Sequence, residues 1–370
     1  MDSSNLLAIT EKFALPSPIL SIERFGNGLI NDTYLANATS RGSKAQFVFQ
    51  RINHHVFREP TALMRNVERV CSHLHSRIGA ENLDQPHRRS LTIVPTTRGV
   101  SFHRIPSFNG SSEAYWRCFH FIDGCTSHDV LDSPAMAYQA AHQFGEFQRL
   151  VADLDGERLT ETIPDFHNTP KRFTALRAAL VADPHGRVAG CEKEIRFAIE
   201  NEAISHRLLS LHHRGLIPER ITHNDTKVSN VLICDQSRKG ICVVDLDTVM
   251  PGLSLYDFGD LMRTCISPVA EDSRDLDAIE VRLPMFEALA AGFLDAMHSV
   301  LTPEEIDNLA FSGILLSYEL GLRFLTDHIL GDTYFSAKHP EHNLHRARNQ
   351  FALARKIQAR ESEMSNALRK

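Results

Sequence analysis

The first third of the chain shows the hydrophobic pattern of β-strands. Runs rich in β-branched and aromatic residues occupy 47–53, 89–96 and 115–124, and clusters of Gly, Asn and Ser separate them. One helical stretch, 59–78, interrupts these runs, and its Pro60 is suited to a first helical turn. The pattern therefore predicts a small sheet-rich lobe that contains one helix.

After Gly124 the period of the hydrophobic positions becomes helical. In 133–153, apolar residues recur every three or four positions, Ser133 is suited to cap the helix and Pro134 to begin it. The stretch 302–330 starts in the same way, with Thr, Pro and two Glu at the positive end of the helix dipole. We expect a helical region in this part of the chain.

The change of period predicts an α+β fold of two lobes. The first, residues 1–123, would hold a sheet with one helix, and the second, 124–370, would be mainly helical. The hinge is expected near Phe121 to Thr126. A chain of 370 residues is long enough for two such units.

Two short hydrophobic strands are expected inside the helical lobe. They are "SNVLIC" at 229–234 and "GICVVDLD" at 240–247, and the polar turn between them predicts a hairpin. The residues "HND" precede the first strand, and "DLD" closes the second. Acidic groups at adjacent strand ends can converge on one cation, so the hairpin is where we look for chemistry.

Composition and charge exclude several classes of protein. The chain is 42% hydrophobic and 23% charged, as in ordinary globular proteins, and its net charge of -6 offers no basic field for nucleic acid or anionic lipid. It has no continuous apolar run of about 18 residues, no signal peptide pattern and no HExxH metal motif. We expect no nucleic acid and no membrane among its partners.

Cysteine usage indicates a reducing compartment. The seven cysteines are odd in number and have no CxxC spacing, which argues against a disulfide framework or a zinc site. We expect reduced thiols and a cytoplasmic protein. The cysteines are Cys71, Cys118, Cys125, Cys191, Cys234, Cys242 and Cys265.

The segment "HNDTKVSN", 223–230, has the outline of a phosphotransferase catalytic loop. Asp225 can orient an attacking hydroxyl and accept its proton, and the amide oxygen of Asn230 can reach Mg²⁺, which prefers oxygen ligands. A second magnesium ligand should come from the next strand. Asp245, at the end of that strand, is preferred to Asp257, which follows a loop with Pro and Gly.

Other polar residues near these motifs have less specific interpretations. Asp257 opens a "DFG" triplet, and we expect it to brace a loop or a helix N-terminus by accepting backbone N–H bonds. His223 is expected to brace the catalytic loop. For Asp247, support of a metal ligand, a second metal contact and recognition of a hydroxyl all stay open.

The catalytic loop followed by "VVDLDT" resembles the aminoglycoside phosphotransferase and choline kinase superfamily, which reads H-x-D-x-x-x-x-N before a strand that ends in Asp. A closer resemblance, to N-acetylhexosamine 1-kinases, is carried by blocks that span nearly the whole chain. These blocks are "GNGLINDTYL" (26–35), "FVFQRIN" (47–53), "ETIPDFHNTPKRF" (161–173), "DLDTVMPGLSLYDFGD" (245–260) and "LGLRFLTDHILGDTYF" (320–335). The resemblance implies a protein-kinase-like bilobal fold.

The resemblance also implies a reaction and its participants. ATP, with Mg²⁺, would phosphorylate the anomeric hydroxyl of N-acetylglucosamine or N-acetylgalactosamine to give the sugar 1-phosphate. Asp225 would be the base and, with Asp245, would face the substrate, and Asn230 and Asp245 would hold the metal. Arg323 and Tyr334 would contact the sugar. The nucleotide would meet Gly26 and Gly28 over its phosphates, and Phe121, Ile122 and Asp123 at the adenine.

The phosphate-binding position departs from the pattern of related kinases. These kinases usually carry Lys or Arg at the end of the third strand, where this chain has Gln50 and Arg51. Side chains alternate along a strand, so the two point to opposite faces, and Arg51 is preferred for its charge. Its carboxylate partner on the following helix would be Glu68 or Glu59.

Several residues in the sugar-binding blocks have competing interpretations. Without the resemblance, Arg323 would pair with Glu319 one helical turn earlier, whereas the resemblance favours a contact with sugar oxygens. Phe166 and His167 would line the sugar site or hold a loop. Asp260 and Arg263, three positions apart, are expected to form a helical ion pair.

Two other functions stay open. A kinase of the same fold could act on choline, homoserine or an aminoglycoside, and a pseudokinase would keep the fold without chemistry. A protein kinase is disfavoured because only eleven residues separate Asp245 from Asp257, too few for an activation segment, and no APE follows the catalytic loop. A pseudokinase usually loses the base or a metal ligand, and both are present here.

Overall fold

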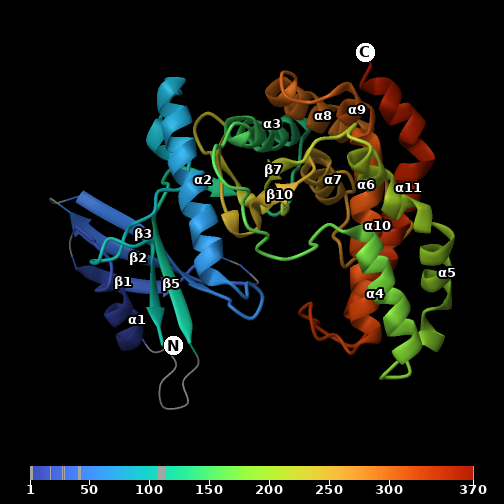
Figure 1. Ribbon diagram of the computed structural model, residues 1–370, viewed down its shortest axis with the longest axis horizontal. Helices are drawn as coiled ribbons and strands as arrows, with labels where there is room; N and C mark the ends of the chain where they lie inside the picture. Colours follow the sequence, from blue (N-terminus) through green and yellow to red (C-terminus); the bar gives the residue numbers. More distant parts are fainter. Residues whose placement is uncertain are drawn as a thin grey trace.

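The computed structural model describes the chain in two parts that lie side by side, a sheet-rich part with the N-terminus and a mainly helical part with the C-terminus (Figure 1). This arrangement confirms the predicted α+β fold. The described residues are 3–16, 18–26, 28, 30–40, 43–106 and 113–369.

The N-terminal part is a five-stranded antiparallel sheet in the order β1-β2-β3-β5-β4. One face packs on α1 through residues such as Leu6, Phe49 and Trp116, and the other face packs on α2. Figure 1 shows α2 between the sheet and the helical part. The bounds are α1 (Ser3–Thr10), β1 (Ile19–Arg24), β2 (Asp32–Ser40), β3 (Ser43–Ile52), α2 (Pro60–Ala80), β4 (Phe102–Ile105) and β5 (Ala114–His120).

The predicted strands of this part are confirmed in two of three places. β3 and β5 lie where 47–53 and 115–124 predict them, and α2 begins at Pro60 as expected. The prediction of a strand at 89–96 is wrong. That segment makes only two isolated bridges among the described residues, Ile93 to Phe119 and Thr96 to Phe13, and β4 takes the edge position beside β5 instead. Pro95 lacks the N–H that would extend the pairing.

The chain leaves the large sheet at His120 and enters a second sheet at Cys125. There β6 (Cys125–Ser127) pairs with β8 (Val231–Cys234), which pairs with β9 (Gly240–Val243). The antiparallel β8–β9 pair confirms the predicted hairpin. A further pair joins β7 (Arg220–Thr222) to β10 (Met250–Gly252), so the segment that follows β7 lies beside the hairpin.

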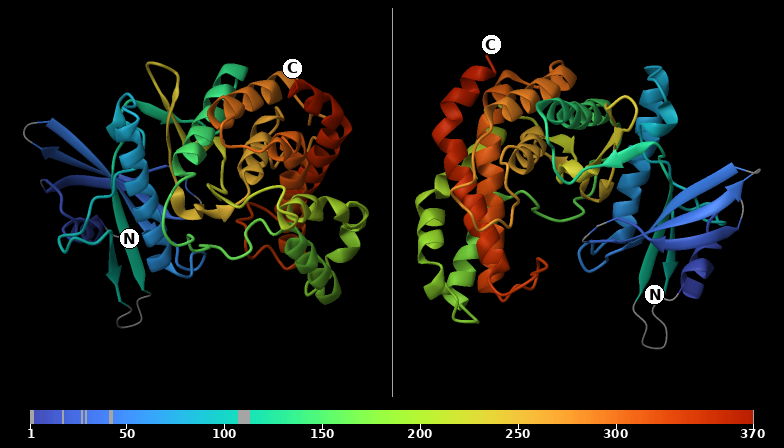
Figure 2. Two further views of the ribbon diagram at one scale, coloured as in Figure 1. Left: turned by 45° about the horizontal axis from the view of Figure 1, so that its top comes forward. Right: turned by 180° about the vertical axis from the view of Figure 1, so that it is seen from behind.

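Helices surround these short strands. The pairs α3–α8 and α10–α11 pack along their lengths, and α10 also packs on α7 and α4 (Figures 1 and 2). The bounds are α3 (Pro134–Val151), α4 (Thr169–Ala182), α5 (Glu192–Glu200), α6 (Arg207–His213), α7 (Ser254–Cys265), α8 (Leu283–Met297), α9 (Pro303–Asp307), α10 (Leu309–Ile329) and α11 (His342–Ala367). Short 3₁₀ turns lie at Pro86–Arg88, Val188–Gly190, Glu202–His206, Val228–Asn230 and Leu246–Thr248.

Capping residues define the starts of two predicted helices. The Ser133 hydroxyl accepts the Met136 N–H and Pro134 begins α3, as expected. Thr302 and Glu305 form a capping box at α9, but the chain bends at Asn308 before α10 begins. The prediction of one helix over 302–330 is therefore wrong, and the Asn308 side chain stabilises the bend by donating to the Glu304 carbonyl at 2.8 Å.

The core of the helical part is built around α10. Over the described residues, α10 is the one helix whose length and hydropathy match those of a membrane span, and 89% of its apolar window is buried within the protein. The apolar composition of α10 therefore has a structural explanation, because α4, α7 and α11 cover the helix.

Candidate active site

A cavity of about 240 Å³ lies where the sheet meets the β8–β9 hairpin. Its walls are apolar near the hinge, where Val48, Ile122 and Leu232 line it. Its other end is polar, and Gln50, Arg117 and Asp245 reach it from three strand segments. An apolar slot with a charged end suits a planar base that carries phosphates.

The catalytic loop after β7 is held by Asp257. This carboxylate lies in the first turn of α7, is 1% exposed, and accepts the N–H groups of His223 and Asn224 at 2.8 and 2.7 Å. It also accepts the Gln148 amide at 2.5 Å. Asp257 thus braces the loop as predicted, and its oxygens point at backbone and amide donors.

His223 has a second bracing role. Its Nε2 lies 2.9 Å from the Val244 carbonyl, and its Nδ1 accepts the Asp225 N–H at 3.3 Å. The ring packs edge-on against Phe144 and Phe147. The bracing role predicted for His223 is confirmed, since both ring nitrogens are engaged with the backbone around Asp225.

The carboxylate of Asp225 lies beside a cation. Lys227 donates to it at 2.8 Å and the Asn230 amide at 3.1 Å. Burial alone would raise the pKa of Asp225, but the charge and hydrogen bond of Lys227, together with His223 and the Asn230 amide, outweigh burial and lower the pKa. The same contact, with the charge of Asp245, raises the pKa of Lys227 despite burial. Asp225 is therefore ionised at neutral pH.

Asn230 and Asp245 meet at the end of the hairpin. The Asn230 carbonyl accepts the Val244 N–H at 2.9 Å, which places Asn230 beside the strand that continues into Asp245. Asp245 has a left-handed backbone with φ 60°, which turns the chain out of β9. Burial, followed by the charge of Asp247, raises the pKa of Asp245 to about 6.

Asn230 and Asp245 are suited to bind a magnesium ion whose remaining ligands include phosphate oxygens of a substrate. The Asn230 Nδ2 donates to Asp225, so its Oδ1 is the atom that is left for a cation. No group of three or more His, Cys, Asp or Glu suited to a metal occurs among the described residues. One or two protein oxygens plus substrate phosphates is the usual arrangement for Mg²⁺.

Asp247 forms an ion pair that links the two parts of the protein. It contacts Arg117 of β5, and each of the two side chains is 2% exposed. Its other oxygen accepts the Asn31 amide at 2.7 Å. The contacts agree with a supporting role for Asp247, one of its three predicted roles. The described structure engages both of its oxygens with protein.

Comparison with known proteins gives this arrangement a family. Residues 21–291 match a family of phosphotransferase enzymes, more than half of the chain. The chain belongs to the phosphotransferase enzyme family. The match agrees with the phosphotransferase part of the predicted resemblance, and the similarity to solved structures confirms the predicted protein-kinase-like fold.

Solved structures resemble the phosphotransferase along almost its whole length. A microcompartment-associated aminopropanol kinase is 14% identical with a TM-score of 0.60, covering 98% of this chain and 99% of its own. A choline kinase from Cryptosporidium parvum is 13% identical at 0.57, covering 98% and 97%. An amicoumacin kinase solved with AMP-PNP and Ca²⁺ is 11% identical at 0.56, covering 96% and 94%. At these low identities, the structural similarity shows a shared fold.

The third strand of the phosphotransferase does not supply the predicted cation. Gln50 lines the cavity, whereas Arg51 lies on the opposite face of β3 with Phe49, 3.9 Å from the Asp32 carboxylate. The preference for Arg51 is therefore corrected, because strand alternation turns it away. Neither Glu59 nor Glu68 pairs with Arg51 in the described structure.

The glycine-rich loop joins β1 to β2 at the mouth of the cavity. Gly26 has φ +73°, a conformation that side chains disfavour, and a Cβ on Gly28 would lie 3.9 Å from the Thr33 hydroxyl, which lines the cavity. The Phe25 ring lies 5.9 Å from that of Phe121. The loop and the hinge thus enclose the same space.

Two of the three predicted hinge residues line the cavity. Phe121 and Ile122 do so, and the Phe121 N–H donates to the Gln46 carbonyl at 3.1 Å. Asp123 lies outside the cavity lining, is exposed, and its carbonyl accepts Arg88 at 2.8 Å. The adenine contact predicted for Asp123 is corrected for this reason.

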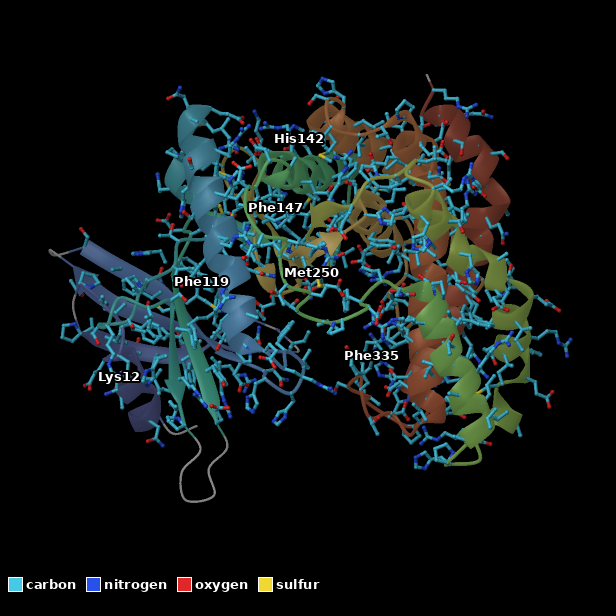
Figure 3. All side chains as sticks on the ribbon, viewed as in Figure 1. Lys12, Phe119, His142, Phe147, Met250 and Phe335 are labelled. Carbon is cyan, nitrogen blue, oxygen red and sulfur yellow. The ribbon has the colours of Figure 1, made fainter. Side chains whose placement is uncertain are left out.

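Arg323 lies in a cluster of aromatic rings at the end of α10. Its guanidinium is 5.0 Å from the Phe166 ring, 5.9 Å from Tyr334 and 5.4 Å from Phe335. Figure 3 shows Phe335 at the edge of the helical part that faces the sheet. The alternative ion pair with Glu319 is absent from the described contacts.

Glu319 instead connects the Arg323 cluster to the catalytic loop. It accepts His167 at 2.8 Å and the Thr169 hydroxyl at 2.6 Å. The other nitrogen of His167 lies 3.1 Å from the carbonyl of Asn224, the neighbour of Asp225. His167 therefore holds a loop, one of its two predicted roles, and ties α10 to the catalytic loop.

Two contributors to the site were not identified from the sequence. Lys227 stands two positions after Asp225 inside the motif, and its charge was a visible signal. Arg117 had no such signal, because nothing in "YWRCFHF" separates a buried ion pair from an exposed strand cation. The predicted helical pair of Asp260 and Arg263 is confirmed at 2.7 Å.

Proposed function

We propose that this phosphotransferase uses ATP and Mg²⁺ to phosphorylate the anomeric hydroxyl of an N-acetylhexosamine. The product is the sugar 1-phosphate, formed from N-acetylglucosamine or N-acetylgalactosamine. The observation that carries the proposal is the Arg323 cluster, tied through Glu319 and His167 to the loop of an ionised Asp225.

The nucleotide end of the proposal rests on the cavity. Its apolar walls suit adenine between the sheet and the hairpin, with phosphates toward Asp245. The amicoumacin kinase with the same fold holds AMP-PNP and Ca²⁺. When bound, Mg²⁺ at Asn230 and Asp245 would neutralise phosphate oxygens. Because the cysteines are free thiols, we also propose that the enzyme works in the cytoplasm.

Asp225 would act on the sugar hydroxyl. Its carboxylate orients the hydroxyl and accepts its proton while the hydroxyl oxygen bonds to the γ-phosphorus. The bond from that phosphorus to the bridging oxygen breaks, and ADP leaves with the electron pair. Lys227, 2.8 Å from Asp225, keeps the carboxylate ionised until it takes the proton.

The charge around Arg323 favours an uncharged acceptor. Arg172 donates to the Phe166 carbonyl at 2.8 Å and Arg323 lies 5.0 Å from the Phe166 ring, so two guanidinium groups share this region. Burial and the charge of Arg323 lower the pKa of Arg172. A quaternary ammonium or an aminoglycoside would meet repulsion there, and the aromatic faces that could bind a cation are already covered by Arg323. Sugar hydroxyl and acetamide oxygens suit the donors of an arginine.

An acceptor panel tests the proposal. We expect ADP release with N-acetylglucosamine or N-acetylgalactosamine and little with choline, homoserine or an aminoglycoside, and we expect NMR to locate the phosphate on the anomeric oxygen. Activity on choline alone would indicate a kinase of the same fold with a different acceptor. Nucleotide binding without turnover on any acceptor would favour a pseudokinase.

The catalytic base has its own test. Asp225→Asn should lower kcat by at least about a thousandfold, because the base and the orientation of the hydroxyl are lost together. Binding of ATP, measured by calorimetry, should change little. A variant that retains near-normal turnover would contradict the role of Asp225.

A further inference from the structure

The polar end of the nucleotide cavity needs a cation that the third strand does not supply. ATP carries several negative charges, and related kinases hold its α- and β-phosphates with a basic residue on β3. Here Gln50 occupies that position and Arg51 faces the other side of the sheet. Lys227 is engaged with Asp225. A different basic residue must therefore meet the phosphates.

We propose that Arg117, on β5, is the residue that binds the α- and β-phosphates of the nucleotide. This inference rests on the proposed use of ATP and adds a binding residue to that site. Arg117 lines the same cavity as Gln50 and Asp245, and it is directly opposite Gln50 in the β3–β5 pairing. The basic residue of the cavity therefore lies on β5 in this protein, one strand away from its position on β3 in related kinases.

The Arg117 side chain is held rigidly at the cavity wall. Its Nε donates to the side-chain amide oxygen of Gln50 at 2.9 Å, its Nη1 contacts Asp247, and its guanidinium lies 5.2 Å from the Phe119 ring. Its Nη2 donates to no residue in the described part of the chain. A guanidinium fixed by two partners, with a donor to spare, loses little entropy when it binds phosphate.

The position of Asp247 links Arg117 to the metal site. Asp247 lies two residues after Asp245, so the anchor of the guanidinium and the proposed magnesium ligand belong to one short turn. Arg117 and Asp245 also line the same cavity, so phosphates held by a cation at Asp245 would lie close to the Arg117 guanidinium.

Gln50 completes the replacement. Its side-chain oxygen orients Arg117 of β5, and its Nε2 donates to Thr33 of β2 at 3.2 Å. The neutral amide of Gln50 therefore bridges β5 and β2. A lysine at this position would place a second positive charge beside the buried guanidinium. The pair of Gln50 and Arg117 thus keeps one cation in the cavity, and Asp247 replaces the helix glutamate of related kinases as its partner.

The affinities of Arg117→Met for ATP, ADP and adenosine distinguish the loss of a phosphate contact from general damage to the protein. We expect calorimetry with Mg²⁺ to show ATP affinity about tenfold to a hundredfold lower, since charged hydrogen bonds are lost. Adenosine affinity should stay within about twofold, because it has no phosphates. Arg117→Lys should recover part of the loss, and Arg51→Met, the matched control on β3, should bind ATP normally.

The buried Asp247 carboxylate requires a second variant. If Arg117→Met does not fold, Arg117→Met with Asp247→Asn removes both charges and should show the same selective loss of ATP over adenosine. Unchanged ATP affinity, an equal loss for adenosine, or a larger effect of Arg51→Met would overturn the assignment. These readouts do not depend on the acceptor, so failure of the sugar kinase proposal is distinguishable from failure of this one.

Discussion

Arg323 shows how one side chain acquires a role from its surroundings. The residue that could have paired with it, Glu319, is fully buried and committed to His167 and Thr169. The guanidinium is left among the rings of Phe166, Tyr334 and Phe335, where stacking orients it and hydrogen-bond donors remain for a ligand.

Replacement of Arg323 should affect the sugar and spare the nucleotide. Arg323→Met should raise the KM for the N-acetylhexosamine by about tenfold to a hundredfold, the cost of losing charged hydrogen bonds. The KM for ATP should not change. Arg177→Met is the control, because Arg177 lies at the same 5.0 Å from a ring, that of Phe173, on the surface. Equal effects in both variants would contradict the role of Arg323.

At the scale of elements, the "DFG" triplet of α7 has a structural explanation. Asp257 braces the catalytic loop, Phe258 is fully buried, and Gly259 lets α7 approach α10. A Cβ on Gly259 would lie 2.5 Å from the Ser312 carbonyl oxygen. The triplet therefore joins the helix core to the catalytic loop.

Gly259→Ala should destabilise the protein. The added methyl group would force α7 away from α10, at a cost of about 1–3 kcal/mol for an overpacked contact. Gly79→Ala is a matched control, because nothing lies within 4 Å of its added Cβ in α2, and there alanine should stabilise by about 0.5–1 kcal/mol. Thermal unfolding of both variants measures the opposite signs, and similar melting temperatures would refute the packing argument.

The contact of α7 with α11 depends on a carboxylate between two arginines. Glu271 bonds Arg263 of α7 and Arg346 of α11, with Arg346 Nη2 at 2.6 Å. Burial alone would raise the pKa of Glu271, but the charges of Arg263 and Arg346 outweigh it and lower the pKa. The ionised group thus stabilises the packing of these helices at neutral pH.

Acid should remove this contribution. Because the folded pKa of Glu271 is below its unfolded value, the stabilisation is present above the unfolded pKa and is lost as pH falls through the folded one. Glu271→Gln should therefore lower the melting temperature at pH 7, with a difference from wild type that shrinks below about pH 4. Glu363→Gln, in the exposed pair with Arg360, should show almost no difference at either pH.

At the scale of the whole molecule, a few polar contacts hold the sheet against the helical part. Asn31 donates to Asp247 at 2.7 Å and accepts the Asn53 N–H at 2.9 Å. Asn66 of α2 donates to the Thr160 carbonyl at 2.7 Å. The contacts of Asn31 with Asp247 and of Asn66 with Thr160 cross from the sheet part to the helical part, and Figure 3 shows Met250 at the side of the helical part that faces α2.

Loss of the Asn31 contact should loosen the two parts. Asn31→Ala leaves the Asn53 N–H and one Asp247 oxygen without their partner, at about 1–3 kcal/mol. Calorimetric unfolding should then start at a lower temperature and broaden, because the sheet loses support from the helical part. Asn37→Ala removes a contact with Ser21 within the sheet and should keep a single sharp transition. A sharp, unshifted transition in Asn31→Ala would contradict this.

Local patterns determined much of this protein. The spacing of apolar residues in α3, its Ser133 cap, the hairpin after Asn230 and the bracing role of Asp257 were all predictable from the sequence. Each depends on residues that are near in the chain, or on a motif whose chemistry tolerates few alternatives. Helix periodicity, capping and turn residues act over a few positions, so sequence alone reveals them.

Tertiary structure decided which distant residues meet. Arg117 contacts Gln50 across 67 positions of sequence and Asp247 across 130, and the choice of Arg51 failed because the face of β3 that borders the cavity depends on how the sheet packs. Long-range register and burial select such pairs, and these exist only in the assembled fold.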